Sequence, residues 1–298
     1  MKDLILACRP KQWTKNLVVF AAPFFAFSSS FAIWFSAFVC FLSFCLVSSS
    51  IYFINDSIDI ESDKKHPFKK YRPIASGLIS IKKAIYSSII LFFLSLLLAI
   101  SINNILFWLI ILYFFIQISY CLKLKKEPII DIFCVSSGFL IRGIAGVKAS
   151  NLDFSPWFLL SIGLLALFLA IEKRKAELQN EIKLKIKTRS SLERYSLSLL
   201  ERIEPIVTTS SFMSYSLWAI NPAINGTSSG YMILTIPFVL MGIFRYQFIT
   251  DPKERKRREI INPYINPEKP EEILLSDKGI IISIIGWLIT IALVGQFN

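Results

Sequence analysis

Residues 32–54 of the chain read AIWFSAFVCFLSFCLVSSSIYFI, and residues 55–63 continue with NDSIDIESD. A membrane-spanning helix needs about 20 predominantly apolar residues, so the first stretch is long enough to cross a bilayer. The second stretch brings four acids and an asparagine to the end of that helix. Together they predict a transmembrane helix whose last turns carry polar chemistry at the membrane surface.

The acids that follow this helix share one face. At about 100° per residue, Asp56, Asp59 and Asp63 fall within an arc of roughly 60°, with Asn55 at its edge and Glu61 on the other side. Three carboxylates on one face repel one another unless a divalent cation neutralises them, and hard oxygen ligands suit Mg²⁺. The spacing therefore predicts a Mg²⁺ site at Asp56, Asp59 and Asp63.

A basic run follows these acids at once. Its members are Lys64, Lys65, His66, Lys69, Lys70 and Arg72. Acids that bind a metal beside bases indicate a polyphosphate that is held from both ends. The alternative is a charged cytosolic loop that closes a helical hairpin, but such a loop has no reason to place its acids on one face.

The composition is that of an integral membrane protein. Hydrophobic residues make up 54% of the 298, aromatic residues 14%, and only 11 are glycine, which excludes an ordinary soluble domain. The sequence predicts an all-α bundle of nine transmembrane helices that forms a single domain over residues 1–298, with its active-site loops on the cytosolic side. The expected spans are 17–31, 32–54, 84–102, 105–122, 129–147, 157–171, 203–220, 231–248 and 280–294.

The basic residues alternate along the chain and so predict an orientation. Lys2, Arg9, Lys11 and Lys15 precede the first span, and nearly all other Lys and Arg follow the even-numbered spans. The connections after spans one, three, five and seven carry only Lys148. Under the positive-inside rule the N-terminus and the basic loops are cytosolic, in a multi-pass protein of a bacterial inner membrane. The net charge of +12 then reflects topology and affinity for anionic headgroups or phosphorylated substrates, with no nucleic acid as a partner.

The fifth span carries two ionisable residues. The loop before it reads YCLKLKKEP at 120–128, and Asp131 opens the span. Asp131 and Arg142 lie on nearly the same helical face but about 16 Å apart along the axis, too far for direct pairing. A guanidinium at that depth costs about 2.5–3.5 kcal/mol on insertion scales. We expect Arg142 to face the bundle interior and meet an anion there; the alternative is a structural Arg–carboxylate pair.

Further charged segments follow the sixth span. Residues 172–178 read EKRKAEL, and residues 189–195 read RSSLERY. An ordinary positive-inside stop would account for the first, and the second is expected to be an amphipathic cytosolic segment. Residues 251–278 are the longest hydrophilic stretch and are expected to lie at the membrane interface.

Cysteine and histidine usage excludes two kinds of site. The five cysteines at 8, 40, 45, 121 and 134 form no Cys-x-x-Cys pair, so we expect free thiols and neither a disulfide framework nor a zinc site. His66 is the only histidine. A mechanism that needs a cluster of histidine ligands is therefore excluded.

These stretches together resemble the UbiA superfamily of intramembrane prenyltransferases. The pattern N-D-x-x-D-x-x-x-D at 55–63, followed by Arg72-Pro73 and Gly77, is similar to the first aspartate motif of that superfamily. One branch, the phosphoribosyltransferases that act on decaprenyl phosphate, is similar over almost the whole chain. The stretches that carry this similarity are RPKQWTKN at 9–16, HPFKKYRPIASG at 66–77, DIF at 131–133, GFLIRGIAG at 138–146, KRKAEL at 173–178 and PEEILL at 270–275.

The resemblance implies a Mg²⁺-dependent enzyme in the bilayer, with phosphoribosyl diphosphate as donor and a polyprenyl phosphate lipid as acceptor. It leaves a homo-oligomer open. Asp56, Asp59 and Asp63 would bind the metal and, with Arg142, form the catalytic set. The residues expected to bind substrate are Lys15, Asn55, His66, Lys69, Arg72, Tyr120, Lys123, Asp131, Lys173, Arg174, Glu177 and Tyr195.

Two departures from the family pattern bear on function. Superfamily members that use prenyl diphosphates usually carry a second Asp-x-x-x-Asp motif, but here Val135 stands four residues after Asp131. This argues against the main alternative, a prenyltransferase that moves an isoprenoid from its diphosphate to an aromatic acceptor. Glu172 and Lys175 stand where the branch has glycine and arginine. A transporter or flippase for a lipid phosphate is a further alternative, but it needs no metal-binding face of three aspartates.

Overall fold

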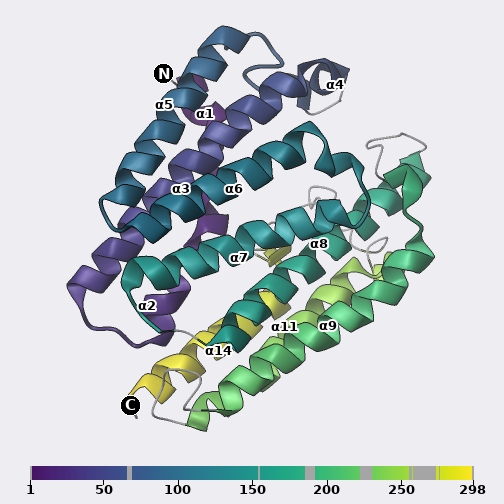
Figure 1. The fold of residues 1–298 in the computed structure, drawn as a ribbon. Coiled ribbons are helices and arrows are strands. Elements are labelled where there is room, and N and C mark those ends of the chain that lie inside the picture. The colour runs from purple at the N-terminus through teal and green to yellow at the C-terminus, as the bar shows by residue number, and fades with distance from the viewer. Residues whose placement is uncertain are drawn as a thin grey trace. The chain divides into compact units, whose positions relative to one another are not determined.

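The computed structural model of the chain describes residues 2–65, 69–153, 155–184, 192–221, 230–254, 257, 273–274 and 276–296. Helices are the regular elements of these ranges, which contain no strand (Figure 1). The all-α fold class expected from the sequence is confirmed. The chain divides into two compact units, Met1–Asp153 and Phe154–Asn298; the expectation of a single domain stays a prediction.

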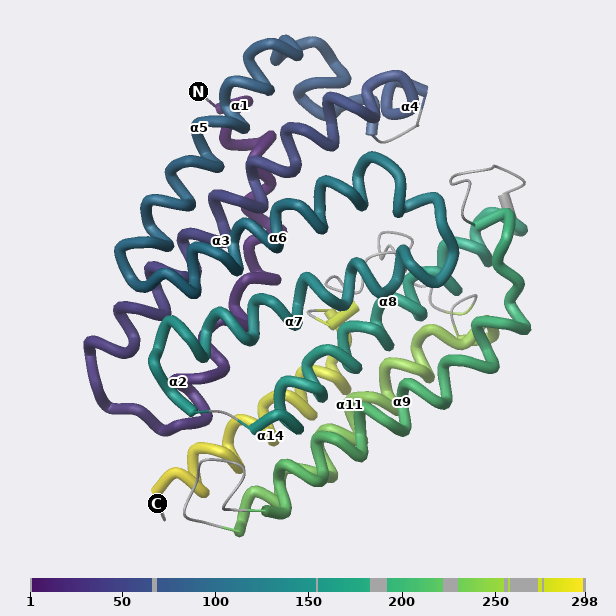
Figure 2. The backbone as a smooth tube through the Cα atoms, viewed as in Figure 1, coloured from purple at the N-terminus to yellow at the C-terminus, as the bar shows by residue number. Residues whose placement is uncertain are grey.

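In the first unit the long helix α3 packs against η1, α5, α6 and α7, an arrangement that can be followed in Figure 2. Its length is 28 residues, so it reaches well beyond the expected span 32–54. The elements of this unit are α1 (Lys2–Ala7), η1 (Pro10–Phe20), α2 (Ala21–Phe25), α3 (Phe31–Ile58), α4 (Ile60–Lys65), η2 (Lys69–Tyr71), α5 (Ile81–Ile100), α6 (Asn104–Leu122), η3 (Leu124–Lys126) and α7 (Ile130–Ser150).

Small residues allow α5 to lie closely along α3. The buried residues of α5 are Ala84, Ser88, Ser95 and Ala99. Small residues at a helix interface let two backbones approach and let hydroxyls bond across. The hydroxyls of Ser50 and Ser88 are 2.8 Å apart, and Ser43 donates to the Ser95 carbonyl at 2.6 Å. The outer face of α5 carries exposed large apolar side chains such as Phe93 and Leu97, which suits contact with lipid.

The first expected span, 17–31, is wrong as a single membrane-spanning helix. η1 ends at Phe20, α2 ends at Phe25, and α3 begins only at Phe31. Phe27, between α2 and α3, has a φ of 46°, in the left-handed region that a right-handed helix cannot include. Hydropathy alone missed this break because apolar residues continue through it.

In the second unit α8 packs against α9, and α11 packs against α14. Phe168 of α8, Ile243 and Tyr246 of α11 and Ile280 of α14 belong to one buried apolar cluster. α14 begins at an Asp277 side chain that accepts from the Ile280 N–H at 3.0 Å, an N-cap of the usual kind. The elements are α8 (Pro156–Leu184), η4 (Leu192–Arg194), α9 (Leu197–Ile220), η5 (Gly230–Thr235), α11 (Ile236–Thr250) and α14 (Lys278–Gly295).

In the described residues, seven helical stretches are long and apolar enough to cross a membrane. They correspond to seven of the nine expected spans. The expected span 203–220 lies in α9, a helix of 24 residues, but Glu204 near its start and the hydroxyl residues at 208–211 lower its hydropathy. The protein is therefore a multi-pass membrane protein, whereas the count of nine spans is not confirmed. The seven stretches are Phe31–Ile58, Ile81–Ile100, Asn104–Leu122, Ile130–Ser150, Pro156–Ile182, Gly230–Thr250 and Lys278–Gly295.

Candidate active site

Three aspartates of the first unit, Asp56, Asp59 and Asp63, lie at the junction of α3 and α4. Asp56 is in the last turn of α3, and Asp59 is the residue that ends the helix. The Asp59 N–H donates to the Asn55 carbonyl at 2.9 Å, and the Asp63 N–H donates to the Asp59 carbonyl at 2.8 Å. Because these bonds continue the helical spacing across the break, the three aspartates stay on successive turns.

Two arginines converge on one oxygen of Asp56, which is only 2% exposed. Arg9 bonds to Oδ1 through Nη2, and Arg72 donates to the same Oδ1 from Nη1 at 3.2 Å. The Asn55 side-chain nitrogen lies 3.5 Å from this atom. A buried carboxylate is stable only when it is paired, and here the pairing comes from two separate loops.

Arg72 also joins Asp56 to Asp63. The same Nη1 atom donates to Asp63 Oδ2 at 2.6 Å, and Asp63 is 3% exposed. Glu61 instead lies on the exposed side, where Lys64 is 3.6 Å from its carboxylate. The structure therefore brings Asp56, Asp63 and Arg72 together and leaves Glu61 outside, as the helical arc predicts.

Asp59 has a cation of its own. Lys125 donates to its two carboxylate oxygens at 2.6 and 2.8 Å. Lys125 lies in η3, the short turn between α6 and α7. Sequence reasoning selected Lys123 from this loop, but Lys123 is exposed and ends α6. The position of Lys125 depends on how the turn folds back toward α3, which no local pattern shows.

Arg9 is the other site residue that sequence reasoning missed. It has φ 54° and ψ 61°, in the left-handed region, which few residues other than glycine adopt and which is common at functional sites. Its guanidinium also lies 4.8 Å from the ring centre of Tyr52, a favourable cation–π distance. The RPKQWTKN stretch was a signal, but only Lys15 was selected from it.

Arg142 is buried in the interior of the first unit, with 5% exposure, as expected. Its hydrogen bonds to described residues go to neutral acceptors: Asn16 Oδ1 at 2.7 Å, Tyr113 Oη at 2.7 Å and the Gly138 carbonyl at 2.9 Å. The Tyr113 ring centre lies 4.8 Å from the guanidinium carbon. In the described part of the chain no carboxylate pairs with Arg142, so these residues show neither the anion expected there nor the structural Arg–carboxylate pair of the alternative.

The expected Mg²⁺ site at Asp56, Asp59 and Asp63 is not complete by itself. Among the described residues no three acids are grouped closely enough to hold a metal by themselves. Mg²⁺ is usually held by one or two carboxylates together with substrate phosphates. Asp56 and Asp63 both reach one cationic nitrogen of Arg72, so their oxygens already converge on a position that favours positive charge.

The other expected residues of the first unit are placed as follows. Asp131 is fully buried in the first turn of α7. Lys15 in η1 and Tyr120 in α6 are half-buried, and Lys69 in η2 is exposed. His66 lies outside the described residues.

The expected residues of the second unit lie mainly on α8. Arg174 is 1% exposed and pairs with Glu177, while the Lys173 ammonium is 4.0 Å from the same carboxylate. Tyr195 is buried just before α9. Arg174 is thus buried and paired with an acid of its own helix, and its expected role in substrate binding stays a prediction.

Glu172 and Lys175, which stand where the branch has glycine and arginine, contact each other. Lys175 donates to Glu172 at 2.9 Å and also bonds to Glu204 of α9. The α11 residues Thr250 and Gln247 donate to Glu172 at 2.6 Å and to Glu204 at 2.8 Å. Glu172 is 1% exposed. The unusual acid at 172 is therefore neutralised by the unusual lysine at 175, within a network that joins three helices.

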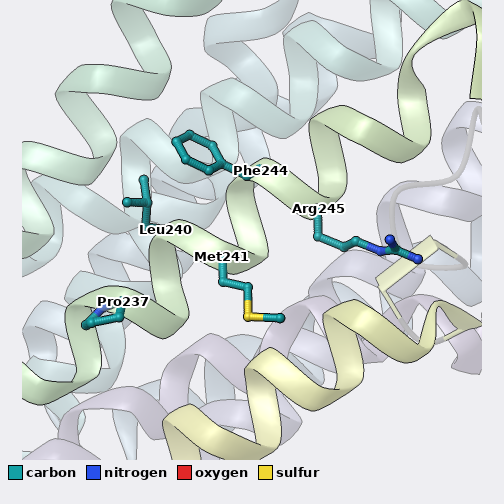
Figure 3. Close-up of a pocket in the computed structure, with 5 residues that line it drawn as sticks. All are labelled: Pro237, Leu240, Met241, Phe244 and Arg245. Carbon is teal, nitrogen blue, oxygen red and sulfur yellow. The ribbon is translucent and has the colours of Figure 1, made fainter.

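A hollow on α11 is a poor candidate for a polar active site. Figure 3 shows its lining, which consists of Pro237, Leu240, Met241, Phe244 and Arg245. Arg245, the one charged member, pairs with Asp277 at 2.9 Å. The other four are apolar and lie on a candidate membrane span, which indicates contact with lipid.

Two curated relatives are similar to nearly the whole chain. A protein of Mycolicibacterium smegmatis named decaprenyl-phosphate phosphoribosyltransferase is 37% identical, over 100% of this chain and 94% of its own. A protein of Corynebacterium glutamicum with the same name is 34% identical, over 97% of this chain and 86% of its own.

Solved structures share the fold. A UbiA homologue from Archaeoglobus fulgidus bound to GPP and Mg²⁺ has a TM-score of 0.69 and 18% identity, over 99% of this chain and 98% of that one. At that identity the similarity establishes the fold alone. The family model described as the UbiA prenyltransferase family matches residues 17–262, which include Asp56, Asp63 and Arg72 but not Arg9. The chain belongs to the UbiA prenyltransferase family.

Proposed function

We propose that the protein transfers a 5-phosphoribosyl group from phosphoribosyl diphosphate to a polyprenyl phosphate and releases diphosphate. The observation that carries this proposal is the cluster in which Arg9 and Arg72 converge on Asp56 while Arg72 also reaches Asp63. Whole-chain relatives named decaprenyl-phosphate phosphoribosyltransferase support it. The cluster combines carboxylates for a metal with cations for phosphate, and a phosphorylated sugar diphosphate needs both.

The aspartates would hold the metal together with the donor. Asp56 and Asp63, with Asp59 beside them, would bind Mg²⁺ through carboxylate oxygens, which are the ligands it prefers. Bound there, the metal would stabilise the negative charge that develops on departing diphosphate. Arg72 would turn from Asp56 and Asp63 toward a phosphate, because a guanidinium fits carboxylate and phosphate oxygens equally well.

Cations from loops and short turns also lie beside these aspartates. Arg9 and Lys125 already contact Asp56 and Asp59, and we assign them to the phosphates of the donor together with Lys69. Asn55, Lys15, Tyr120, Lys123, Asp131 and His66 remain proposed substrate contacts. Lys173, Arg174, Glu177 and Tyr195 of the second unit remain proposed substrate contacts.

The reaction needs no strong general base. A phosphate monoester is already anionic at neutral pH, so the lipid phosphate can attack C1 of the ribose as the bond to diphosphate breaks and positive charge builds on the ring. Catalysis then consists of positioning and charge stabilisation, worth about 7–11 kcal/mol for well-oriented reactants. We place the site on the cytosolic side of a bacterial inner membrane, because the basic loops lie on that side under the positive-inside rule.

The test is a transfer assay on purified protein in lipid. Radiolabelled phosphoribosyl diphosphate, a polyprenyl phosphate and Mg²⁺ should give a labelled lipid that is lost when EDTA is added. Failure to label any polyprenyl phosphate over a series of chain lengths would contradict the proposal.

The second candidate is a prenyltransferase that moves an isoprenoid from its diphosphate to an aromatic acceptor. Its support is the fold, which is shared with homologues solved with GPP or DMAPP. The same preparation incubated with labelled prenyl diphosphate and candidate acceptors separates the two activities. Product from the prenyl donor, with none from phosphoribosyl diphosphate, would favour this second candidate.

A further inference from the structure

The segment 8–20, here called the strap, brings Arg9 to Asp56. It consists of Cys8, Arg9 and the 11-residue 3₁₀ helix η1, which contacts both α3 and α7. Runs of 3₁₀ helix longer than three or four residues are uncommon because their hydrogen-bond geometry is poor. Contacts from outside must therefore hold the strap in this form.

On one side the strap is fastened to α3 near the site. The Trp13 indole N–H donates to the Ser49 hydroxyl at 3.1 Å. That hydroxyl has one proton and two acceptors within reach, the Cys8 carbonyl at 3.1 Å and the Cys45 carbonyl of α3 at 2.7 Å. The contacts at Cys8 and Trp13 flank Arg9 on both sides along the chain. They explain how a residue with a left-handed backbone keeps one position over Asp56.

On the other side the strap is fastened to α7 through Asn16. The Asn16 side chain is fully buried; it accepts from Arg142 Nε at 2.7 Å and donates to Cys45 Sγ at 3.3 Å. The Val19 carbonyl lies so close to Gly146 that any side chain there would collide with it.

All three nitrogens of the Arg142 guanidinium donate hydrogen bonds. Nε bonds to Asn16, Nη1 to the Gly138 carbonyl and Nη2 to the Tyr113 hydroxyl. Three acceptors in three directions fit a planar guanidinium, and a lysine ammonium cannot reproduce that geometry. A buried cation is costly in a membrane, so an arginine held only by neutral acceptors calls for a specific role.

We propose that Arg142 is a positioning residue, which fixes the strap through Asn16 and so holds Arg9 against Asp56. This assignment replaces the catalytic role expected from the sequence. It rests on the proposed function only where activity is the readout.

A matched pair of variants at Asn16 tests the link. Asn16→Asp keeps an oxygen for Arg142 Nε, whereas Asn16→Leu has similar size but accepts nothing. We expect Asn16→Leu to lower transfer about 100-fold, the cost of roughly 1 Å of misplacement, and Asn16→Asp to lose at most about tenfold, the value of one hydrogen bond. Thr14→Val is the control, because the Thr14 hydroxyl is exposed and bonds only to Lys11 of the same strap.

Arg142→Lys and Arg142→Met separate charge from geometry. If the hydrogen-bond geometry of the guanidinium matters, both variants lose transfer activity to a similar extent. If Arg142 acts by charge on an anion, Arg142→Lys keeps activity that Arg142→Met lacks, and this result would overturn the proposal.

Cys8 supplies a readout that needs no activity. Its thiol is half-buried, and burial raises its pKa, so reaction with a maleimide at neutral pH should be slow. A strap released from α7 exposes Cys8, and we expect Asn16→Leu to raise its labelling rate about tenfold or more while Asn16→Asp and Thr14→Val leave the rate unchanged. Cys8→Ser identifies the signal from this thiol.

The two readouts distinguish two kinds of failure. Unchanged Cys8 labelling in a folded Asn16→Leu variant would overturn the role of the strap, whatever the activity. Faster labelling in that variant supports it even if the wild-type protein transfers no phosphoribosyl group, in which case the proposed function alone is wrong.

Discussion

Each unit of the molecule contains a buried cluster of acids, and the two clusters are neutralised in different ways. In the first unit the cations that meet the aspartates come from loops or short turns: Arg9 before η1, Arg72 after η2 and Lys125 in η3. In the second unit Lys175 of α8 forms ion pairs with both Glu172 and Glu204. Thr250 and Gln247 of α11 donate further hydrogen bonds to these two acids.

We propose that the difference separates a site for chemistry from a structural network. Loop residues can move to meet a ligand at modest cost, so the cations of the first unit can exchange carboxylate for phosphate. The second network is built from side chains on three packed helices, and its members cannot leave without breaking helix contacts. We therefore expect the first cluster to control activity and the second to control stability.

The largest expected effect is loss of activity at Asp56. Asp56→Asn removes the charge on which two arginines converge, and we expect transfer to fall by about 1,000-fold while the protein stays folded in detergent. The matched control is Glu61→Gln, since Glu61 is an exposed acid of the same segment. Near-normal turnover of Asp56→Asn at saturating Mg²⁺ would contradict the metal assignment.

The converse effect is expected at Lys175. Lys175→Met leaves two buried carboxylates facing each other, so it should lower the free energy of unfolding by about 3–5 kcal/mol, measured by thermal unfolding in detergent. Lys175→Arg keeps the charge and should recover most of this loss, and so should the triple variant E172Q/K175M/E204Q. The comparison between the two clusters would fail if folded Lys175→Met retained stability but lost transfer.

The close contact between Gly146 and the Val19 carbonyl allows the packing of the strap on α7 to be tested by adding one methyl group. Gly146→Ala places a methyl group against the Val19 carbonyl, and overpacking of this kind costs about 1–3 kcal/mol. We expect both a lower unfolding temperature and lower transfer. Gly242→Ala is the matched control in the second unit, because its added carbon would meet Ser283 only at 3.9 Å. Equal behaviour of the two alanine variants would count against the packing of η1 on α7.

The smallest effect is expected at Lys125. Lys125→Gln removes the cation that bonds to Asp59 at 2.6 and 2.8 Å, and we expect kcat/KM for the phosphorylated donor to fall about tenfold, as for one charged hydrogen bond. Lys126→Gln, at an exposed neighbour in the same turn, should behave like the wild type. A larger loss from Lys126→Gln than from Lys125→Gln would mean that the loop acts only through its net charge.

The aspartate face could be predicted from sequence because a helix fixes side-chain direction by spacing alone. Asp56 and Asp63 share a bridging arginine and Glu61 lies outside, as that spacing requires. The cost of a guanidinium inside a membrane predicted that Arg142 faces the interior, and it is buried there. Hydropathy located the long spans, since a run of about 20 apolar residues matches the thickness of a bilayer.

Hydropathy failed where the chain stays apolar but stops being one helix. The break between α2 and α3 depends on the backbone at Phe27, which apolarity does not report. Arg9 and Lys125 were missed for a related reason. Each lies far from its partner in sequence, by 47 and 66 residues, so only packing decides which loop cation meets which acid.

The sequence by itself determined that the chain is helical, crosses a membrane and carries a face of aspartates followed by bases, because these properties follow from local periodicity and composition. The tertiary structure decided which cations neutralise which acids, that Glu172 and Lys175 compensate each other, and that Arg142 bonds to the strap. Those choices depend on contacts between segments that are distant in sequence, and the free energy of such contacts is set by the packing of the folded chain.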